Sequence, residues 1–143
     1  MKIKLLFLLT LNSIFSFQVE DCGGDFKLLP HPKEWEIKGN SKLSVTDLKY
    51  YFNPSGISLP AGSDFLDGAT ATNERDEAQL VYIIDHDLES KAEGYLMDIS
   101  NDQIQITAKD QAGLIYGLAS LEQMMEDAEE QEKKLPICNI KDY

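Results

Sequence analysis

The chain has 143 residues, of which 43% are hydrophobic and 27% are charged, and its formal net charge is −12. A surface this acidic repels nucleic-acid phosphates and anionic lipids, and the sequence contains a single arginine. These two features exclude a nucleic-acid-binding function. The length supports a single domain with one hydrophobic core, and the composition argues against global disorder.

The first 17 residues are predicted to form a signal peptide. Lys2 and Lys4 provide a positive start, and Leu5 to Leu11 provide an apolar core. That core is shorter than the roughly 20 residues needed to span a bilayer, so we expect cleavage near Ser16; an uncleaved N-terminal anchor is the alternative. The chain is therefore expected to be exported, either to a periplasm or out of the cell, with residues 18–28 as an N-terminal extension.

Short elements are predicted next. Residues 29–32 have a proline at every second position and should be extended, because proline disfavours a helical conformation in the residue before it. The pattern then predicts a strand at 35–37, a turn at 38–40, a second strand at 43–45 and a short helix from Thr46 or Asp47 to Tyr51. Trp35 suggests a sugar-stacking site, but tryptophan is mostly buried in folded proteins, so core packing is preferred.

Residues 55–79 are predicted to be a solvated loop, because they combine glycines and prolines with scattered acidic side chains. Their acidic residues do not follow the spacing of a calcium-binding loop. The continuous apolar run 80–84 is typical of a strand buried on both faces. Asp85-His86-Asp87 follows it, and we interpret this triplet as surface charge, since three adjacent residues cannot converge on one ion without distant ligands. His31 and His86 belong to unrelated segments, which argues against zinc.

Residues 94–108 are predicted to form a β-hairpin. Apolar and polar residues alternate on both sides of Asn101-Asp102, the expected two-residue turn, and both turn residues tolerate the positive φ that such turns use. This turn aligns the apolar residues of the two strands in pairs: Tyr95 with Ala108, Met97 with Ile106, and Ile99 with Ile104.

A helix is predicted to follow at once, with Asp110 as its N-cap. Gly113 and Gly117 each cost about 1 kcal/mol relative to alanine inside a helix, so we expect the helix backbone to approach the sheet closely there. The charged run 126–134 should be a solvated helix end, and 135–140 a last strand. The apolar stripe of the helix recurs at helical spacing: Leu114, Leu118, Leu121 and Met125.

Several short motifs stand in a fixed order along the chain: Gly94-Tyr95, Ile99-Ser100, Ile104, Ile106-Thr107-Ala108, Ala112-Gly113-Leu114, Tyr116-Gly117-Leu118 and Leu121-Glu122-Gln123-Met124. Their order resembles the small α+β domain that precedes the catalytic barrel in glycoside hydrolase family 20, the β-N-acetylhexosaminidases. The resemblance spans residues 29–143 and includes the opening 29–34 and the final strand 135–143. It implies a mostly antiparallel sheet with helices on one face, a zincin-like architecture.

The resemblance also implies where the chemistry lies. In this family the substrate's N-acetyl oxygen attacks the anomeric carbon, while a glutamic acid and a neighbouring aspartate act from a barrel of roughly 250 residues. This chain is too short to contain that barrel, and its Asp76-Glu77 lies in the predicted loop, so we expect no catalytic, cofactor or metal-binding residue here. The expected partners are the barrel itself and, through it, amino-sugar glycans, with no membrane in the mature form.

Two other functions stay open from the sequence. The chain could be a free-standing exported carbohydrate-binding module, or the equivalent domain of another glycosidase, such as a hyaluronidase-like or α-glucuronidase enzyme. The state of the two cysteines is also open: Cys22 and Cys138 could form a bridge between the ends of the domain, or remain two unrelated thiols.

Overall fold

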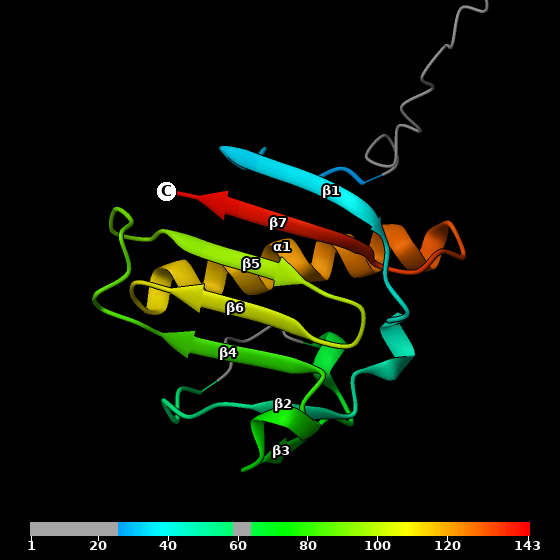
Figure 1. The fold of residues 1–143 in the computed structure, drawn as a ribbon, viewed down its shortest axis with the longest axis horizontal. Helices are drawn as coiled ribbons and strands as arrows, with labels where there is room; N and C mark the ends of the chain where they lie inside the picture. Colours follow the sequence, from blue (N-terminus) through cyan, green and yellow to red (C-terminus); the bar gives the residue numbers. More distant parts are fainter. Residues whose placement is uncertain (1–25, 59–63) are drawn as a thin grey trace, which may run out of the picture.

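The computed structural model describes residues 26–58 and 64–143, which form a seven-stranded sheet with one α-helix against it (Figure 1). The predicted signal peptide and Cys22 lie outside the described residues. The strands are β1 (Glu34–Asn40), β2 (Tyr50–Phe52), β3 (Thr70–Thr72), β4 (Leu80–Ile84), β5 (Tyr95–Ile99), β6 (Ile104–Ala108) and β7 (Pro136–Asp142). The helix α1 is Gln111–Glu130, and three 3₁₀ helices are η1 (Val45–Asp47), η2 (Asp64–Leu66) and η3 (Arg75–Glu77).

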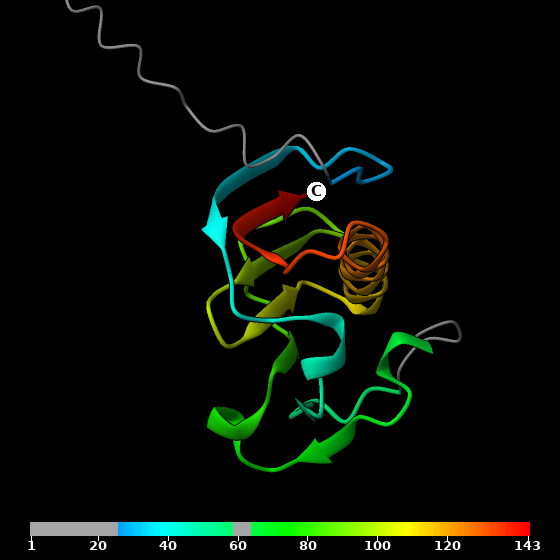
Figure 2. The ribbon, with the colours of Figure 1, turned by 90° about the vertical axis from the view of Figure 1, so that its right-hand side faces the viewer.

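The strand order is β1-β7-β5-β6-β4-β2-β3. Antiparallel pairing joins β1, β7, β5 and β6, and parallel pairing adds β4, β2 and β3 at the other edge. Figure 2 shows α1 on one side of the sheet, where it packs against β4, β5 and β6. The predicted α+β class is therefore confirmed. None of the helices formed by the described residues has the length and hydrophobicity needed to cross a bilayer.

The predicted hairpin is formed by β5 and β6 with the expected register, in which Tyr95 pairs with Ala108 and Ile99 with Ile104. All four of these side chains are buried beneath α1. The expectation of a positive φ at Asn101-Asp102 was wrong, because the described residues outside glycine with positive φ are Glu93 and Glu132. The turn is instead closed by bonds between residues 100 and 103, in which the Ser100 amide and hydroxyl both donate to the Gln103 carbonyl.

The predicted N-cap of α1 is confirmed. One Asp110 carboxylate oxygen accepts from the Gly113 amide at 2.8 Å, and the other accepts from the Glu93 amide at 2.8 Å. These backbone bonds, with Glu93 first, lower the pKa of Asp110. The cap therefore fixes both the start of α1 and the loop that leads into β5.

The two helix glycines lie where the helix backbone meets the sheet, as predicted. A Cβ atom at Gly113 would lie 2.4 Å from the Gly94 carbonyl oxygen, and one at Gly117 would lie 2.7 Å from Ile106 Cγ2. The buried side of α1 includes the predicted stripe and extends it: Leu114, Leu118, Leu121, Met124, Met125 and Ala128.

The first third of the described chain differs from the predictions. The expected turn at 38–40 is part of β1, which continues through a register shift at Gly39. The expected strand at 43–45 is absent, because residues 41–43 bond separately to Leu135 and Asn101 and make no continuous ladder. The expected helix to Tyr51 is only η1, and β2 begins at Tyr50.

The predicted solvated loop 55–79 is also more ordered than expected within its described part. It contains η2, β3 and η3, and β3 pairs in parallel with β2. Leu66 and Ala78 are buried, and Phe65 packs against the core. These contacts involve residues distant in sequence, so local composition did not reveal them.

Candidate functional site

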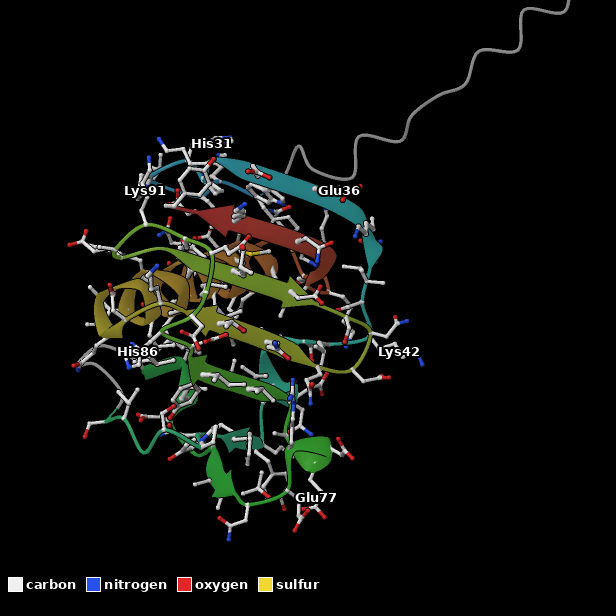
Figure 3. All side chains as sticks on the ribbon, turned by 60° about the vertical axis from the view of Figure 1, so that its left-hand side comes forward. His31, Glu36, Lys42, Glu77, His86 and Lys91 are labelled. Atoms are coloured by element: carbon white, nitrogen blue, oxygen red, sulfur yellow. The ribbon has the colours of Figure 1, made fainter. Side chains whose placement is uncertain are left out.

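The polar groups noted in the sequence do not converge. Asp85, His86 and Asp87 are exposed after β4, where the His86 Nδ1 lies 3.1 Å from the Lys109 carbonyl oxygen. Figure 3 shows His31 near β1 at one end of the molecule and His86 well away from it. Within residues 26–58 and 64–143, no group of three or more His, Cys, Asp or Glu could hold a metal ion.

The acidic pair Asp76-Glu77 lies on η3 and is exposed. The Thr72 hydroxyl donates to Glu77 Oε2 at 3.5 Å, and Figure 3 shows Glu77 at the end of the molecule opposite His31. A carboxylic acid that protonates a glycosidic oxygen needs a raised pKa in an enclosed pocket. An exposed pair on a surface turn lacks that enclosure.

Trp35 is half-buried and packs against the core, as predicted. Its Nε1 is buried and has no hydrogen-bond partner among the described residues. Tyr82 is also buried, and burial raises its pKa to about 12. Its ring stacks on Tyr51 with centroids 5.8 Å apart. Trp35, Tyr51 and Tyr82 therefore all contribute to packing in the core.

Cys138 lies on β7, is fully buried and forms no disulfide with any described residue. Burial raises its pKa to about 12, so it stays protonated at neutral pH. Because Cys22 lies outside the described residues, the choice between a bridge and two separate thiols is still open.

The sheet face opposite α1 is polar. Glu36, Asn139, Asp98 and Gln105 lie in one row across four neighbouring strands. The Asn139 amide donates to Asp98 Oδ1 at 2.7 Å, and Arg75 donates to Gln105. The face is hollowed by a depression of about 530 Å³. Its polar groups bond to one another, which is how a solvated sheet face satisfies them.

The outward side of α1 is different, because its first half carries a second apolar stripe. Ala112, Ile115, Tyr116 and Ala119 follow i, i+3, i+4, i+7 spacing, so they share one helix face. The Ile115 residue is 39% exposed and Tyr116 is 50% exposed. The sequence contained this signal, but the stronger inner stripe accounted for the helix without it. The second half of the outward side is acidic and exposed at Glu126, Glu129 and Glu130.

A segment from the start of the described chain borders this stripe. Gln123 clamps Leu29: its Oε1 accepts from the Leu29 amide at 2.8 Å, and its Nε2 donates to the Leu29 carbonyl at 3.0 Å. The Lys27 amide also donates to Asp127 at 2.6 Å. Although its backbone is held on both sides, the Leu29 residue is 76% exposed.

Tyr143 completes the same surface. It is 40% exposed, and the Lys91 and Lys141 ammonium groups lie 5.2 and 5.3 Å from its ring centroid. Figure 2 shows the blue segment that begins the described chain and the C-terminus at the same edge of the molecule. A depression of about 230 Å³ connects Leu29, Tyr116 and Tyr143. We call the following residues the outer α1 face: Leu29, Pro30, Ala112, Ile115, Tyr116, Ala119 and Tyr143.

The sequence matches the family model described as glycosyl hydrolase family 20, domain 2, over residues 25–143. The chain belongs to this family. The match agrees with the fold described above, in which the hairpin and α1 carry the motifs noted in the sequence. No curated protein sequence matches the chain.

Similar folds occur in solved hexosaminidase structures. A β-N-acetylhexosaminidase from Bacteroides fragilis is 22% identical with a TM-score of 0.60, over 80% of this chain and 24% of that one. A chitobiase from Flavobacterium johnsoniae is 24% identical with a TM-score of 0.53, over 82% and 20%. The N-acetyl-β-hexosaminidase of Streptomyces plicatus is 19% identical with a TM-score of 0.59, over 80% and 26%. The chain thus spans between a fifth and about a quarter of these proteins, and at such identities the likeness shows the fold.

Proposed function

We propose that this domain is the non-catalytic accessory domain of an exported β-N-acetylhexosaminidase, an enzyme that removes terminal N-acetyl-hexosamine residues. The observation that carries the proposal is the family match over residues 25–143, on a chain that spans only about a quarter of a similar hexosaminidase. The domain's role is to support a separate catalytic barrel, and amino-sugar glycans are bound by that barrel.

The absence of hydrolysis by the domain alone is part of the proposal. It is supported by the exposed position of Asp76-Glu77 and by the self-paired polar groups of the open sheet face. Export is supported by the charged start and apolar core of the first 17 residues, which lie outside the described ones.

The test is an assay of purified residues 18–143 with a nitrophenyl N-acetyl-β-glucosaminide, using the Bacteroides fragilis hexosaminidase as a positive control. We expect no turnover by the domain, and turnover above the buffer blank would overturn the non-catalytic role. The DNA after the Tyr143 codon, or the adjacent gene, should encode a barrel with a neighbouring Asp-Glu pair. Titration with chitin oligosaccharides is the matching test of the binding-module alternative, for which saturable binding by the domain alone would be required.

Export has its own test. The full chain expressed with a C-terminal tag should lose its first residues and appear outside the cytoplasm, as measured by fractionation and N-terminal sequencing of the tagged product. Retention of Met1 on a cytoplasmic product would contradict export.

A further inference from the structure

We propose that the sheet face opposite α1 holds a binding site for one neutral pyranose unit of a glycan, centred on Leu96. The inference rests on the proposed function for the identity of the glycan, an amino-sugar oligosaccharide. It adds to the contact made by the barrel a second contact on the accessory domain itself. The side chains that form the site are Leu96, Asp98, Thr107 and Lys141.

This face of the sheet is hollowed rather than flat. Its depression of about 530 Å³ lies over β1, β7, β5 and β6, and small-molecule sites typically occupy about 300–1,000 Å³. Figure 2 shows α1 on the other side of the sheet. Leu96, Thr107 and Lys141 are nevertheless half-buried, because longer side chains rise around them. The floor of the depression is therefore sheltered while its mouth is open.

The polar side chains of the depression hold one another in place. Asn139 donates to Asp98 Oδ1 at 2.7 Å, and Gln105 Nε2 donates to Thr107 Oγ1 at 3.1 Å. A solvated sheet face satisfies its polar groups in the same way, so these bonds alone do not identify a ligand site. They do fix the side chains before binding, which lowers the entropy that a ligand must overcome.

Three hydrogen-bonding functions are left unused by this network within the described residues. Asp98 Oδ2 accepts no bond, and the Thr107 hydroxyl accepts one but donates none. The Lys141 ammonium lies 3.8 Å from Glu34, beyond hydrogen-bond distance. These three functions surround Leu96. Thr107 and Lys141 pair with it from the two neighbouring strands, and Asp98 is two positions further along the same face of β5.

An apolar side chain ringed by donors and acceptors matches a sugar ring. One face of a pyranose carries C–H groups that pack on an apolar surface, and its hydroxyls project from the edge. Leu96 supplies the apolar surface, Asp98 Oδ2 accepts from a hydroxyl, and Thr107 and Lys141 donate to others. Same-face neighbours on adjacent strands are about 5 Å apart, a spacing that one ring with its hydroxyls spans.

The charges around the depression favour a neutral ligand. Three cationic groups offset three carboxylates there, although the whole chain has a formal net charge of −12. Lys38 lies 3.5 Å from Glu36, so that carboxylate is already paired and offers little to a cationic ligand. An anionic ligand is repelled by the acidic chain as a whole. The carboxylates are Glu34, Glu36 and Asp98, and the cationic groups are Lys38, Arg75 and Lys141.

The test is an NMR titration of isotope-labelled residues 18–143 with a chitin oligosaccharide. We expect saturable shifts of amides on β5, β6 and β7. Asp98→Asn keeps an oxygen that can accept from Asn139 and removes the free acceptor, so it should raise the Kd at least tenfold. Glu129→Gln is the matched control, because it makes the same change of charge on the exposed outward side of α1. Its Kd should stay within twofold of the unmodified value.

A second variant removes one donor without changing the charge. Thr107→Val keeps the shape of the side chain and suits a strand, so the domain should stay folded. The loss of the hydroxyl should raise the Kd by about threefold to tenfold. The amide spectrum of each variant without ligand must match that of the unmodified domain, so that the comparison concerns the site alone.

The outcomes separate this site from the proposed function. If no saturable shift appears, if the shifts lie on α1, or if Glu129→Gln weakens binding as much as Asp98→Asn, the site is overturned and the hexosaminidase assignment stands. Tighter binding of an oligogalacturonate, which is anionic, would overturn the neutral class of ligand. The expected shifts in a chain whose following DNA and adjacent gene encode no barrel would support the site, while the accessory role would fail.

Discussion

Replacing Gly113 with alanine tests how closely α1 lies on the sheet. The new Cβ would be 2.4 Å from the Gly94 carbonyl oxygen and 2.9 Å from the Glu93 carbonyl carbon. Real Cβ atoms essentially never approach within 3.0 Å, so the helix or the loop must move. Both contacts are with backbone, which cannot turn aside as a side chain can.

The expected change in the free energy of unfolding for Gly113→Ala is the difference of two opposing effects. Alanine is favoured over glycine in a helix interior by about 1 kcal/mol. Forcing an extra methyl group into a packed interior typically costs about 1–3 kcal/mol, and the rigid backbone contact places Gly113→Ala near the upper end. The free energy of unfolding should therefore fall by about 2 kcal/mol. Gly117→Ala meets Ile106 Cγ2 at 2.7 Å, a side-chain atom that can adjust, so its net loss should be about 1 kcal/mol or less.

Urea unfolding followed by far-UV circular dichroism measures both variants against the unmodified domain. The order of the two losses is the informative result, because the propensity gain is common to both. A Gly113→Ala variant as stable as the unmodified domain, or more stable, would show that α1 does not approach Gly94 as described, and the explanation of the two glycines would be wrong.

Three other outcomes are expected. Leu121→Ala, at a fully buried position, should lower the free energy of unfolding by about 3 kcal/mol, whereas Ile115→Ala on the outer α1 face should change it by about 0.5 kcal/mol or less in urea titrations. The free energy of unfolding should fall as the pH rises above about 9. Burial raises the pKa of Cys138 and Tyr82 to about 12, so the unfolded chain loses these protons at a lower pH than the folded domain does. Urea midpoints that stay level from pH 8 to about 11 would contradict this. Cys138 should resist a thiol reagent at pH 8 until urea is added, and fast labelling of the folded domain at that position would show that β7 is more accessible than its burial indicates.

The hairpin and α1 could be predicted because their determinants are local. The pairing of Tyr95 with Ala108 follows from alternation around a two-residue turn, and Asp110 is adjacent to the helix it caps. The strands β2 and β3 have three residues each and pair in parallel through a connection of more than a dozen residues. Segments so short have no periodicity of their own, and their partners are set by tertiary contacts.

The outer α1 face was only partly predictable from the sequence. The spacing of Ala112, Ile115, Tyr116 and Ala119 is visible in the sequence itself. The contribution of Leu29 was not, because the clamp joins it to Gln123 across 94 positions of the chain. Such long-range bonds between a side-chain amide and a backbone have no sequence signature.

The inward and outward sides of α1 serve different purposes in the molecule. If the exposed apolar stripe on the outward side had arisen by chance, it should be unrelated to the position of other exposed apolar groups. Instead Leu29 and Tyr143, from opposite ends of the described chain, line one depression with Tyr116. Exposed apolar groups that gather from three separate elements mark an interaction surface, whereas single ones are ordinary. The same helix thus builds the core with its inner stripe and leaves its outer stripe exposed, so the outer residues can be varied without changing the fold.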